Sequence, residues 1–312
     1  MKILIAYDGS GAADAVMADL RHAGLAADVE ALVMSVADVF VPPAGDEIVD
    51  NTFPLYVPEG IKLAHARARH QLDQAEALAQ RASEQLKSIF PDWHLNYQAE
   101  ADSPAWAVIK RAGQWKPDLI VMGARGHSVL GGRLILGSIS QRVLYEARCS
   151  VRIARNLNRS SDKPHRLLIG VDSSSDSGAA VDMVCKRNWL KGTEVGLLTV
   201  VDTVMPVTGD AAKRSEVKWI EVADEGNWDQ VREVFEPWAQ KIREAGLHAE
   251  VLIRRGNAAD EILEEAHTWG ADCIFVGARG TRGIDRLLLG SVSAAVSARA
   301  HCSVEVVRPQ EI

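Results

Sequence analysis

The sequence GARGHSVLGGRLILGSIS runs from Gly123 to Ser140, and a close copy of it, GARGTRGIDRLLLGSVS, runs from Gly277 to Ser293. Each copy follows a short apolar run that predicts a strand. It begins with two glycines three residues apart and ends with Gly-Ser before a predicted helix. Glycines let the backbone approach a ligand closely, and the N–H groups at a helix start attract anions. We therefore expect each stretch to hold a phosphate group.

The duplication extends over the whole chain. KILIAYDGS at 2–10 matches RLLIGVDSS at 166–174, which makes Asp8 equivalent to Asp172, and CSVRIAR from Cys149 matches CSVEVVR from Cys302. A chain of 312 residues fits two units of about 150 residues each. The segment NLNRSSDKPH between the copies is polar, lacks periodicity and contains a proline. We therefore expect a first domain over 1–158 and a second over 163–312.

Apolar runs alternate with helical stretches in both halves. Runs such as ILIAY and LLIGV are apolar throughout, as strands covered on both faces require. Strands are expected at 2–8, 29–37, 94–101, 118–123, 150–155, 166–171, 194–201, 248–255, 272–277 and 303–308. Helices are expected in the first half at 11–22, 61–89, 104–114 and 138–147, and the segments 41–60 and 203–226 are expected to be long connections. This order predicts an α/β fold of two tandem doubly wound domains, each with a five-stranded parallel sheet flanked by helices.

Composition limits the classes of function. The formal net charge is −7, of which −2 falls in the first half and −5 in the second, so neither half is expected to bind nucleic acid. The few apolar residues after Lys2 are too few for a secretory signal, and no stretch approaches the length of a membrane span. A soluble, cytoplasmic protein without a membrane partner is expected. The four cysteines form no CxxC pair and are expected to be reduced core thiols.

The aspartates that end the first strand of each half are the second candidate feature. In open α/β sheets, ligands bind outside the carboxyl ends of the strands, so Asp8 and Asp172 are expected to flank the same crevices as the glycine loops. A carboxylate can accept hydrogen bonds from ribose hydroxyls or from the adenine amino group, but it repels phosphates. The alternative interpretation is that both aspartates cap the helices that follow them, and the two roles are compatible.

These features together resemble the universal stress protein family. The second loop matches the signature of that family, G-x2-G-x9-G-[ST], with Gly277, Gly280, Gly290 and Ser291, and the order of strands and helices agrees across essentially the whole chain, in tandem. The resemblance implies an adenine nucleotide α hydrolase-like fold and ATP as the ligand, with AMP and ADP as alternatives and with or without Mg²⁺. It also implies a role in stress response through nucleotide-dependent changes of conformation or of protein partner.

The resemblance assigns roles to matching positions. Asp172 is implied at the adenosine, the backbone of Val200 at the adenine edge, and the Gly-Ser helix start at the phosphates. The arginines at equivalent places in the two loops are added because they bring positive charge beside the proposed phosphates. The candidates in the second half are Asp172, Val200, Val276, Gly277, Arg279, Gly280, Gly290, Ser291, Val292 and Ser293. Those in the first half are Asp8, Val36, Met122, Gly123, Arg125, Gly126, Gly137, Ser138, Ile139 and Ser140.

The first loop departs from the signature. Ten residues, not nine, separate Gly126 from Gly137, and a Gly-Gly pair at 131–132 lies in the longer span. The pair can absorb the extra residue as a bulge, or the helix start can be displaced. We expect the first site to bind nucleotide more weakly than the second.

Features of an efficient enzyme are missing from the sequence pattern. No Ser-His-Asp grouping, metal-ligand spacing or lysine in the glycine loops appears. Rapid phosphoryl transfer is therefore not expected, and no catalytic residue is assigned. Slow ATP hydrolysis, adenylation of a substrate and a scaffold without nucleotide stay as alternatives.

The strands at 150–155 and 303–308 would be edge strands, which tend to be covered or paired. The resemblance implies that they meet in an internal pseudo-dimer, with a homodimer and an unidentified protein partner as further possibilities.

Overall fold

A computed structural model describes residues 1–39, 59–124, 136–155, 163–201, 204–208, 217–221, 228–280 and 289–309. The first half contains β1 (Lys2–Ala6), α1 (Gly11–Leu20), β2 (Glu30–Ala37), α2 (Glu59–Ile89), β3 (His94–Ala101), α3 (Pro104–Trp115), β4 (Leu119–Gly123), α4 (Ser138–Glu146) and β5 (Ser150–Ala154). The second half contains β6 (Arg166–Val171), α5 (Ser175–Cys185), β7 (Glu194–Val201), β8 (Val204–Thr208), β9 (Val217–Glu221), α6 (Trp228–Glu244), β10 (His248–Arg255), α7 (Ala258–Trp269), β11 (Cys273–Gly277), α8 (Ser291–Arg299) and β12 (Ser303–Val307).

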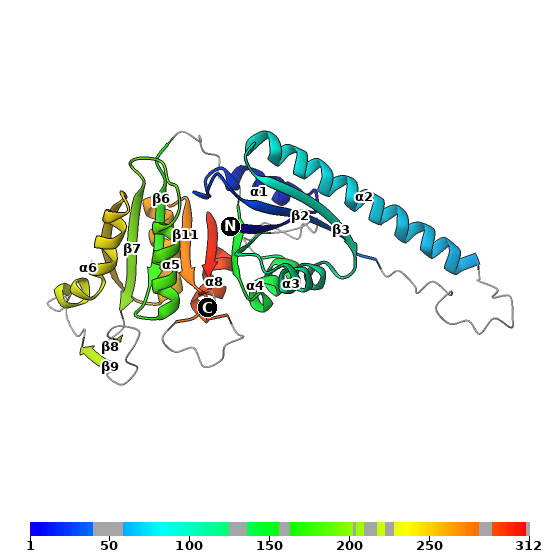
Figure 1. Cartoon of the computed structure of the whole chain (residues 1–312). Coiled ribbons are helices and arrows are strands. Elements are labelled where there is room, and N and C mark those ends of the chain that lie inside the picture. The colour runs from blue at the N-terminus through cyan, green and yellow to red at the C-terminus, as the bar shows by residue number, and fades with distance from the viewer. Residues whose placement is uncertain are drawn as a thin grey trace.

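One ten-stranded sheet runs through both halves (Figure 1), in the order β10-β7-β6-β11-β12-β5-β4-β1-β2-β3. Within each half all five strands are parallel, as the uniformly apolar runs predicted. The two halves meet where β12 pairs with β5 in antiparallel orientation. The expected pairing of the two last strands is confirmed, and it removes two exposed sheet edges.

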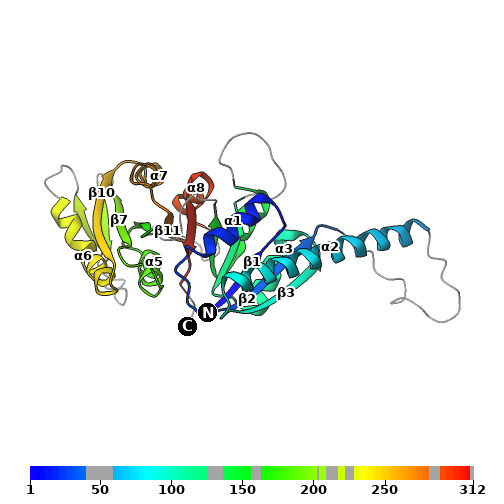
Figure 2. The same ribbon diagram turned by 90° about the horizontal axis from the view of Figure 1, so that it is seen from above.

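Helices cover both faces of the sheet (Figure 2), and the two faces differ at the junction between the halves. On one face, side chains of α3, α4, α7 and α8 belong to one apolar core that continues from the first half into the second. On the other face, α1 and α2 cover one core, and α5 and α6 cover another. The apolar core is therefore continuous on one side of the sheet and divided on the other.

Helix starts follow from the sequence next to the first strand of each half. The Ser10 side chain accepts a hydrogen bond from the Ala13 N–H and begins α1, and Ser174 accepts from the Ser177 N–H and begins α5. A side-chain oxygen at this position satisfies one of the N–H groups that lack a partner in the first helical turn. The N-caps are thus the serines, and Asp8 and Asp172 stand two residues before them.

The two halves differ most after their second strand. Helix α2 has 31 residues, about 46 Å at 1.5 Å per residue, and its first turns extend beyond the sheet in both views (Figures 1 and 2). The equivalent α6 has 17 residues. The segment 203–226, expected to be a long connection, contains the two-stranded antiparallel sheet of β8 and β9.

Candidate functional site

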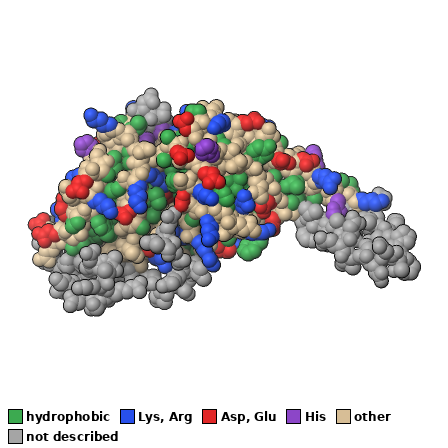
Figure 3. All heavy atoms as spheres, viewed as in Figure 1, with side chains coloured by type: hydrophobic (Ala, Val, Ile, Leu, Met, Phe, Trp, Pro, Cys, Tyr) green, Lys and Arg blue, Asp and Glu red, His purple; other side chains and the backbone are tan. Residues whose placement is uncertain are grey.

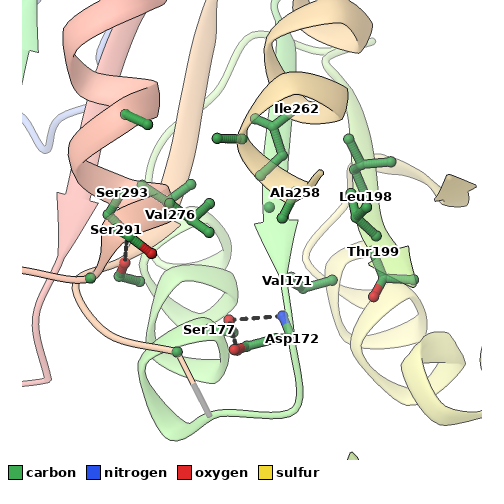
Figure 4. Close-up of a pocket in the computed structure, with 18 of the residues that line it drawn as sticks. Val171, Asp172, Ser177, Leu198, Thr199, Ala258, Ile262, Val276, Ser291 and Ser293 are labelled. Carbon is green, nitrogen blue, oxygen red and sulfur yellow. Dashed lines mark hydrogen bonds between the residues drawn. The ribbon is translucent and has the colours of Figure 1, made fainter. Parts of the chain in front are cut away.

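The carboxyl ends of three neighbouring strands define the site in the second half. Strand β6 lies between β7 and β11, and each continues into a turn at the same edge of the sheet. The edge holds a cavity of about 720 Å³, bounded by these turns and by the first turns of α7 and α8 (Figure 4). This volume lies within the usual range for a small-molecule site.

The predicted residues of the second half come together here. All ten line the cavity, although they come from four separate stretches of sequence. They are Asp172, Val200, Val276, Gly277, Arg279, Gly280, Gly290, Ser291, Val292 and Ser293.

The start of α8 forms one wall of the cavity. Gly290 is the N-cap residue of this helix and provides no side-chain cap. Its N–H donates to the Ala278 carbonyl oxygen at 2.8 Å, and the Ser293 Oγ donates to the Gly277 carbonyl oxygen at 2.5 Å. These bonds fix the helix start against the end of β11. The arrangement presents the positive end of a helix, with its backbone N–H groups, to the cavity, a geometry that favours anions.

Asp172 stands across the cavity from α8 (Figure 4). Its Oδ1 accepts hydrogen bonds from the Ser174 N–H at 3.1 Å, the Ser174 Oγ at 2.5 Å and the Ser177 Oγ at 2.8 Å. The second oxygen lies next to Gly280, because a methyl group built on that glycine would be 2.6 Å from Asp172 Oδ2. Any side chain at position 280 would therefore meet the carboxylate at the mouth of the cavity.

The packing of α5 requires a glycine at position 277. A methyl group on Gly277 would lie 2.8 Å from the carbonyl carbon of Asp176 in the first turn of α5. The same holds in the first half, where a methyl group on Gly123 would lie 2.5 Å from the carbonyl oxygen of Ala12. Contacts this short do not occur for real side chains. The first glycine of each loop is thus required for packing of the helix, whatever the cavity binds.

Positive charge at the cavity is balanced by acids. The Arg279 Nε lies 3.2 Å from Asp176 Oδ2, and the Asp176 side chain is only 4% exposed. Arg299, at the end of α8, pairs with Asp260 at 2.7 Å, and both residues line the cavity. The expectation that Arg279 brings positive charge to the phosphates therefore needs a qualification, because its guanidinium is held by a buried carboxylate.

Sequence reasoning missed the contribution of α7. The Asn257 side chain accepts from the N–H groups of Ala259 and Asp260 and begins this helix, and all three residues line the cavity together with Ile262. The signal was present, since Asn257 follows a predicted strand and is a favoured N-cap residue. Sequence alone gave no reason to bring that turn to the glycine loop, because the contact depends on how the crossover helix packs.

The first half repeats the local geometry in its described residues. The Ser140 Oγ donates to the Gly123 carbonyl oxygen at 2.8 Å, and the Gly137 N–H donates to the Ala124 carbonyl oxygen at 2.8 Å. Asp8 Oδ1 accepts from the Ser10 N–H at 3.0 Å. Of the other candidates, Val36, Met122, Ser138 and Ile139 are at the same sheet edge or helix start. Arg125 and Gly126 lie outside the described residues.

Tyr7 precedes Asp8, a candidate residue of the first half, and its side chain is buried. Burial raises the pKa of its phenol to about 12, and its hydroxyl donates to Asp14 Oδ1 at 2.8 Å, which favours the neutral form further. The phenol is therefore a neutral hydrogen-bond donor at physiological pH. It keeps the end of β1 attached to α1.

Comparison with known proteins decides the family. The model of the universal stress protein family matches the chain twice, at residues 1–155 and 164–308. The chain belongs to the universal stress protein family. It is a tandem member, because each half is matched separately by the same family model.

Relatives of this universal stress protein match one or both halves. Universal stress protein YxiE of Bacillus subtilis is 30% identical over 152 residues, 46% of this chain and 99% of the relative. A universal stress protein of Mycobacterium tuberculosis is 28% identical over 195 residues, and this match covers 62% of the chain and 60% of the relative's own length. Another from the same species is 24% identical over 310 residues, 98% of the chain and 96% of the relative.

Solved structures share the fold of this universal stress protein. The crystal structure of a universal stress protein from Archaeoglobus fulgidus superimposes with a TM-score of 0.64 at 19% identity, and covers 98% of both chains. This likeness confirms the predicted architecture of two tandem α/β units, consistent with the adenine nucleotide α hydrolase-like fold.

Membrane-spanning helices and metal sites were the other features considered among the described residues. No helix among them has both the length and the apolar character needed to cross a lipid bilayer. In the same residues, no three His, Cys, Asp or Glu side chains gather as metal ligands. Acidic and basic side chains are interspersed over the face of the molecule that Figure 3 shows.

Proposed function

We propose that this tandem universal stress protein binds an adenine nucleotide in the cavity of its second half and acts by nucleotide-dependent change of conformation or partner. The observation that carries the proposal is the meeting of all ten predicted second-half residues around one cavity at the carboxyl edge of the sheet. The residues come from strand ends, a loop motif and a helix start, and the carboxyl edge of the sheet brings them together around a cavity of ligand size.

The chemistry of the lining fixes the orientation of the ligand in this proposal. The phosphates lie at the start of α8, where the N–H groups of Ser291 and Val292 meet the positive end of the helix. The sugar and base lie toward Asp172, since a carboxylate accepts from ribose hydroxyls and repels phosphate. The apolar side chains of Val276, Leu198 and Ile262 form the part of the lining suited to the base.

The glycines support the fit of a nucleotide. Space against the Asp172 carboxylate is kept open by the missing side chain of Gly280, since a Cβ there would lie within 2.6 Å of Oδ2. Gly290 similarly lets the backbone at the α8 start approach an anion. ATP is the proposed ligand, with AMP and ADP as alternatives. Mg²⁺, where present, would be held by the phosphates of ATP at the start of α8, since Mg²⁺ usually binds proteins through substrate phosphates.

A charge introduced at the α8 start tests the proposal. Isothermal titration of ATP into wild-type protein is expected to give saturable binding. Gly290→Asp is expected to weaken binding at the second site at least about tenfold, because a carboxylate then faces the phosphates. Gly113→Asp is the matched control, since Gly113 lies in α3 with open space around it. Wild-type protein that binds no adenine nucleotide, or equal binding by all three proteins, would contradict the proposal.

The domain bounds belong to the same proposal. We take the first unit as residues 1–158 and the second as 163–312. Strand β5 ends at Ala154 and β6 begins at Arg166, so both bounds fall between the last strand of one unit and the first strand of the next.

A further inference from the structure

The divided face of the sheet contains a buried group of charges at the junction between the halves. The Arg152 guanidinium donates to both carboxylate oxygens of Asp19, at 2.6 and 2.9 Å, and to Glu305 Oε2 at 3.1 Å. Glu305 also accepts from Arg187. All four side chains are 3% exposed or less. Charges so deeply buried are costly unless each is paired, so their arrangement is tightly constrained.

The central pair occupies the pseudo-twofold axis of the molecule. Arg152 is the fourth residue of CSVRIAR, and Glu305 is the fourth residue of CSVEVVR. In the antiparallel ladder between β5 and β12 these two residues are directly opposite each other. A position on such an axis faces its own equivalent. Here the equivalents carry opposite charge, one arginine and one glutamate.

The contacts that the equivalent residues Arg155 and Arg308 make away from the axis are the same in both directions. The Arg155 guanidinium donates to the Cys302 carbonyl oxygen at 3.3 Å, and the equivalent Arg308 donates to the Cys149 carbonyl oxygen at 3.2 Å. The backbone N–H groups of both arginines also bond to equivalent serine hydroxyls of the opposite strand. These contacts would form equally well between two identical halves, so they do not distinguish one pairing from another.

The charge order does distinguish them. Across the junction it runs Asp19, Arg152, Glu305, Arg187, which alternates in sign. Two first halves would place one Arg152 against another, and two second halves would place Glu305 against Glu305 in a buried position. Like charges in such surroundings repel strongly. The residues beside the central pair also differ between the halves, because the second half has Met183 at the position equivalent to Asp19.

A small residue completes the fit. The Arg187 guanidinium donates to the Ala23 carbonyl oxygen of the first half at 2.9 Å, and Ala23 is itself the position equivalent to Arg187. Two second halves would thus bring two arginines to the place where this structure has one arginine and one alanine.

We infer that the β5 surface of the first half, with Arg152 and Asp19, is an interface that accepts the second half of this protein and rejects another first half, and that buried charge order makes the selection. The same holds in reverse for the β12 surface. The inference does not depend on nucleotide binding. As a consequence, the first half of a chain pairs with its own second half, and two chains do not pair through identical halves.

Partner choice can be measured after the linker is cut. A protease site is inserted between Arg159 and Ser160, the purified full chain is cut, and the mixture is unfolded in urea and refolded by dilution. Native mass spectrometry then counts the pairs. Random choice gives one half unlike pairs. We expect unlike pairs to exceed each kind of identical pair at least about twentyfold, which is tenfold above the random ratio of two and corresponds to about 1.4 kcal/mol. Identical pairs in the random proportion would overturn the inference.

Paired neutral variants then test the role of charge. Asp19→Met with Arg152→Leu removes the charges of the first half, and Arg187→Ala with Glu305→Leu removes those of the second. Replacing a whole buried ion pair by apolar residues is often tolerated, so folding is expected in both. Each variant is expected to form identical pairs of its neutral half in amounts at least tenfold above wild type. Arg155→Ala is the control, because it weakens a contact that every pairing shares and should leave the proportions unchanged.

Two results would contradict the role of charge. The first is exclusive unlike pairing in both neutral variants, which would move the selection to shape contacts such as Trp189 on Gly24, where a methyl group would lie 2.8 Å from the indole. The second is the appearance of identical pairs in Arg155→Ala alone.

Discussion

The two halves of this universal stress protein share a five-stranded parallel sheet and the bonds at the ends of the glycine loop, and they differ in the charges placed around them. Both fix the glycine loop by the same pair of hydrogen bonds, from Ser140 and Gly137 in the first half and from Ser293 and Gly290 in the second. Asp176, which holds Arg279 in the second half, has Ala12 as its equivalent in the first. The comparison teaches that duplication has kept the bonds that build the loop, while the groups around it have diverged.

The same contrast is visible at the junction. Arg155 and Arg308 make equivalent hydrogen bonds to the opposite half. The buried acids and arginines on the other face of the sheet have no such equivalence between the halves. The charged residues of the two halves thus differ at the junction and beside the glycine loops. The changes below probe equivalent positions of the two halves.

The largest effect is expected from Asp19→Met, which gives the first half the residue of the second. Asp19 is fully buried and accepts two hydrogen bonds from Arg152, so its loss leaves a buried guanidinium with one carboxylate fewer. Breaking a buried ion pair in this way costs about 3–5 kcal/mol. Urea unfolding should show a loss of this size. The double variant with Arg152→Leu should recover much of it, and a single variant as stable as wild type would rule out the account of this network.

The next effect compares the two loops as ligand sites. Gly290→Asp and Gly137→Asp place the same charge at equivalent helix starts. Ten residues lie between Gly126 and Gly137, whereas nine lie between Gly280 and Gly290. We therefore expect the first site to bind ATP more weakly. Removal of the second site should then cost most of the measurable affinity, at least about tenfold, or about 1.4 kcal/mol. Titration of ATP into each variant gives the two losses. Identical losses would contradict unequal sites.

Alkaline pH should weaken both halves through equivalent thiols. Burial raises the pKa of Cys149 to about 11 and that of Cys302 to about 12. Both thiols keep their protons to higher pH in the folded state, so their contribution to stability is complete below about pH 9 and is lost as pH rises toward the folded values. At pH 10 each thiol should cost about 1 kcal/mol. Urea unfolding at pH 8 and pH 10 measures the loss, which Cys149→Ala should reduce.

The smallest effect concerns Asp176→Ala, which copies the first half into the second. The change releases the Arg279 guanidinium from its partner and removes one negative charge beside the cavity. We expect ATP to bind a few-fold more tightly, by about 0.5–1 kcal/mol, and AMP to gain less. Lys241 and Asp182 form an ion pair outside the cavity lining, so Asp182→Ala serves as the control. Weaker ATP binding by Asp176→Ala would contradict the expectation.

Much of the fold was predictable because strands that are buried on both faces are apolar along their whole length. The predicted ranges agree with every strand of the ten-stranded sheet to within two residues at each end, although the outer strands β3 and β10 are not apolar throughout. The hairpin of β8 and β9 was missed, since each of its strands has only five residues. The start of α2 was placed at 61 and lies at Glu59.

The site was predictable only in part, for a different reason. A loop motif reveals residues that are close in sequence, and position at the end of a strand adds Asp172. Asn257 and Asp260 line the same cavity through the packing of α7, which no local pattern records. The pairing of Arg279 with Asp176 and of Arg152 with Asp19 was likewise invisible, because charges distant in sequence acquire partners only in the folded chain.

A crystal structure of the protein grown with ATP tests the central claim most directly. The account predicts electron density for a nucleotide in the second-half cavity, with phosphates at the N–H groups of Ser291 and Val292 and the ribose within hydrogen-bond distance of Asp172. A cavity filled by solvent or by the protein's own side chains at saturating ATP would contradict it.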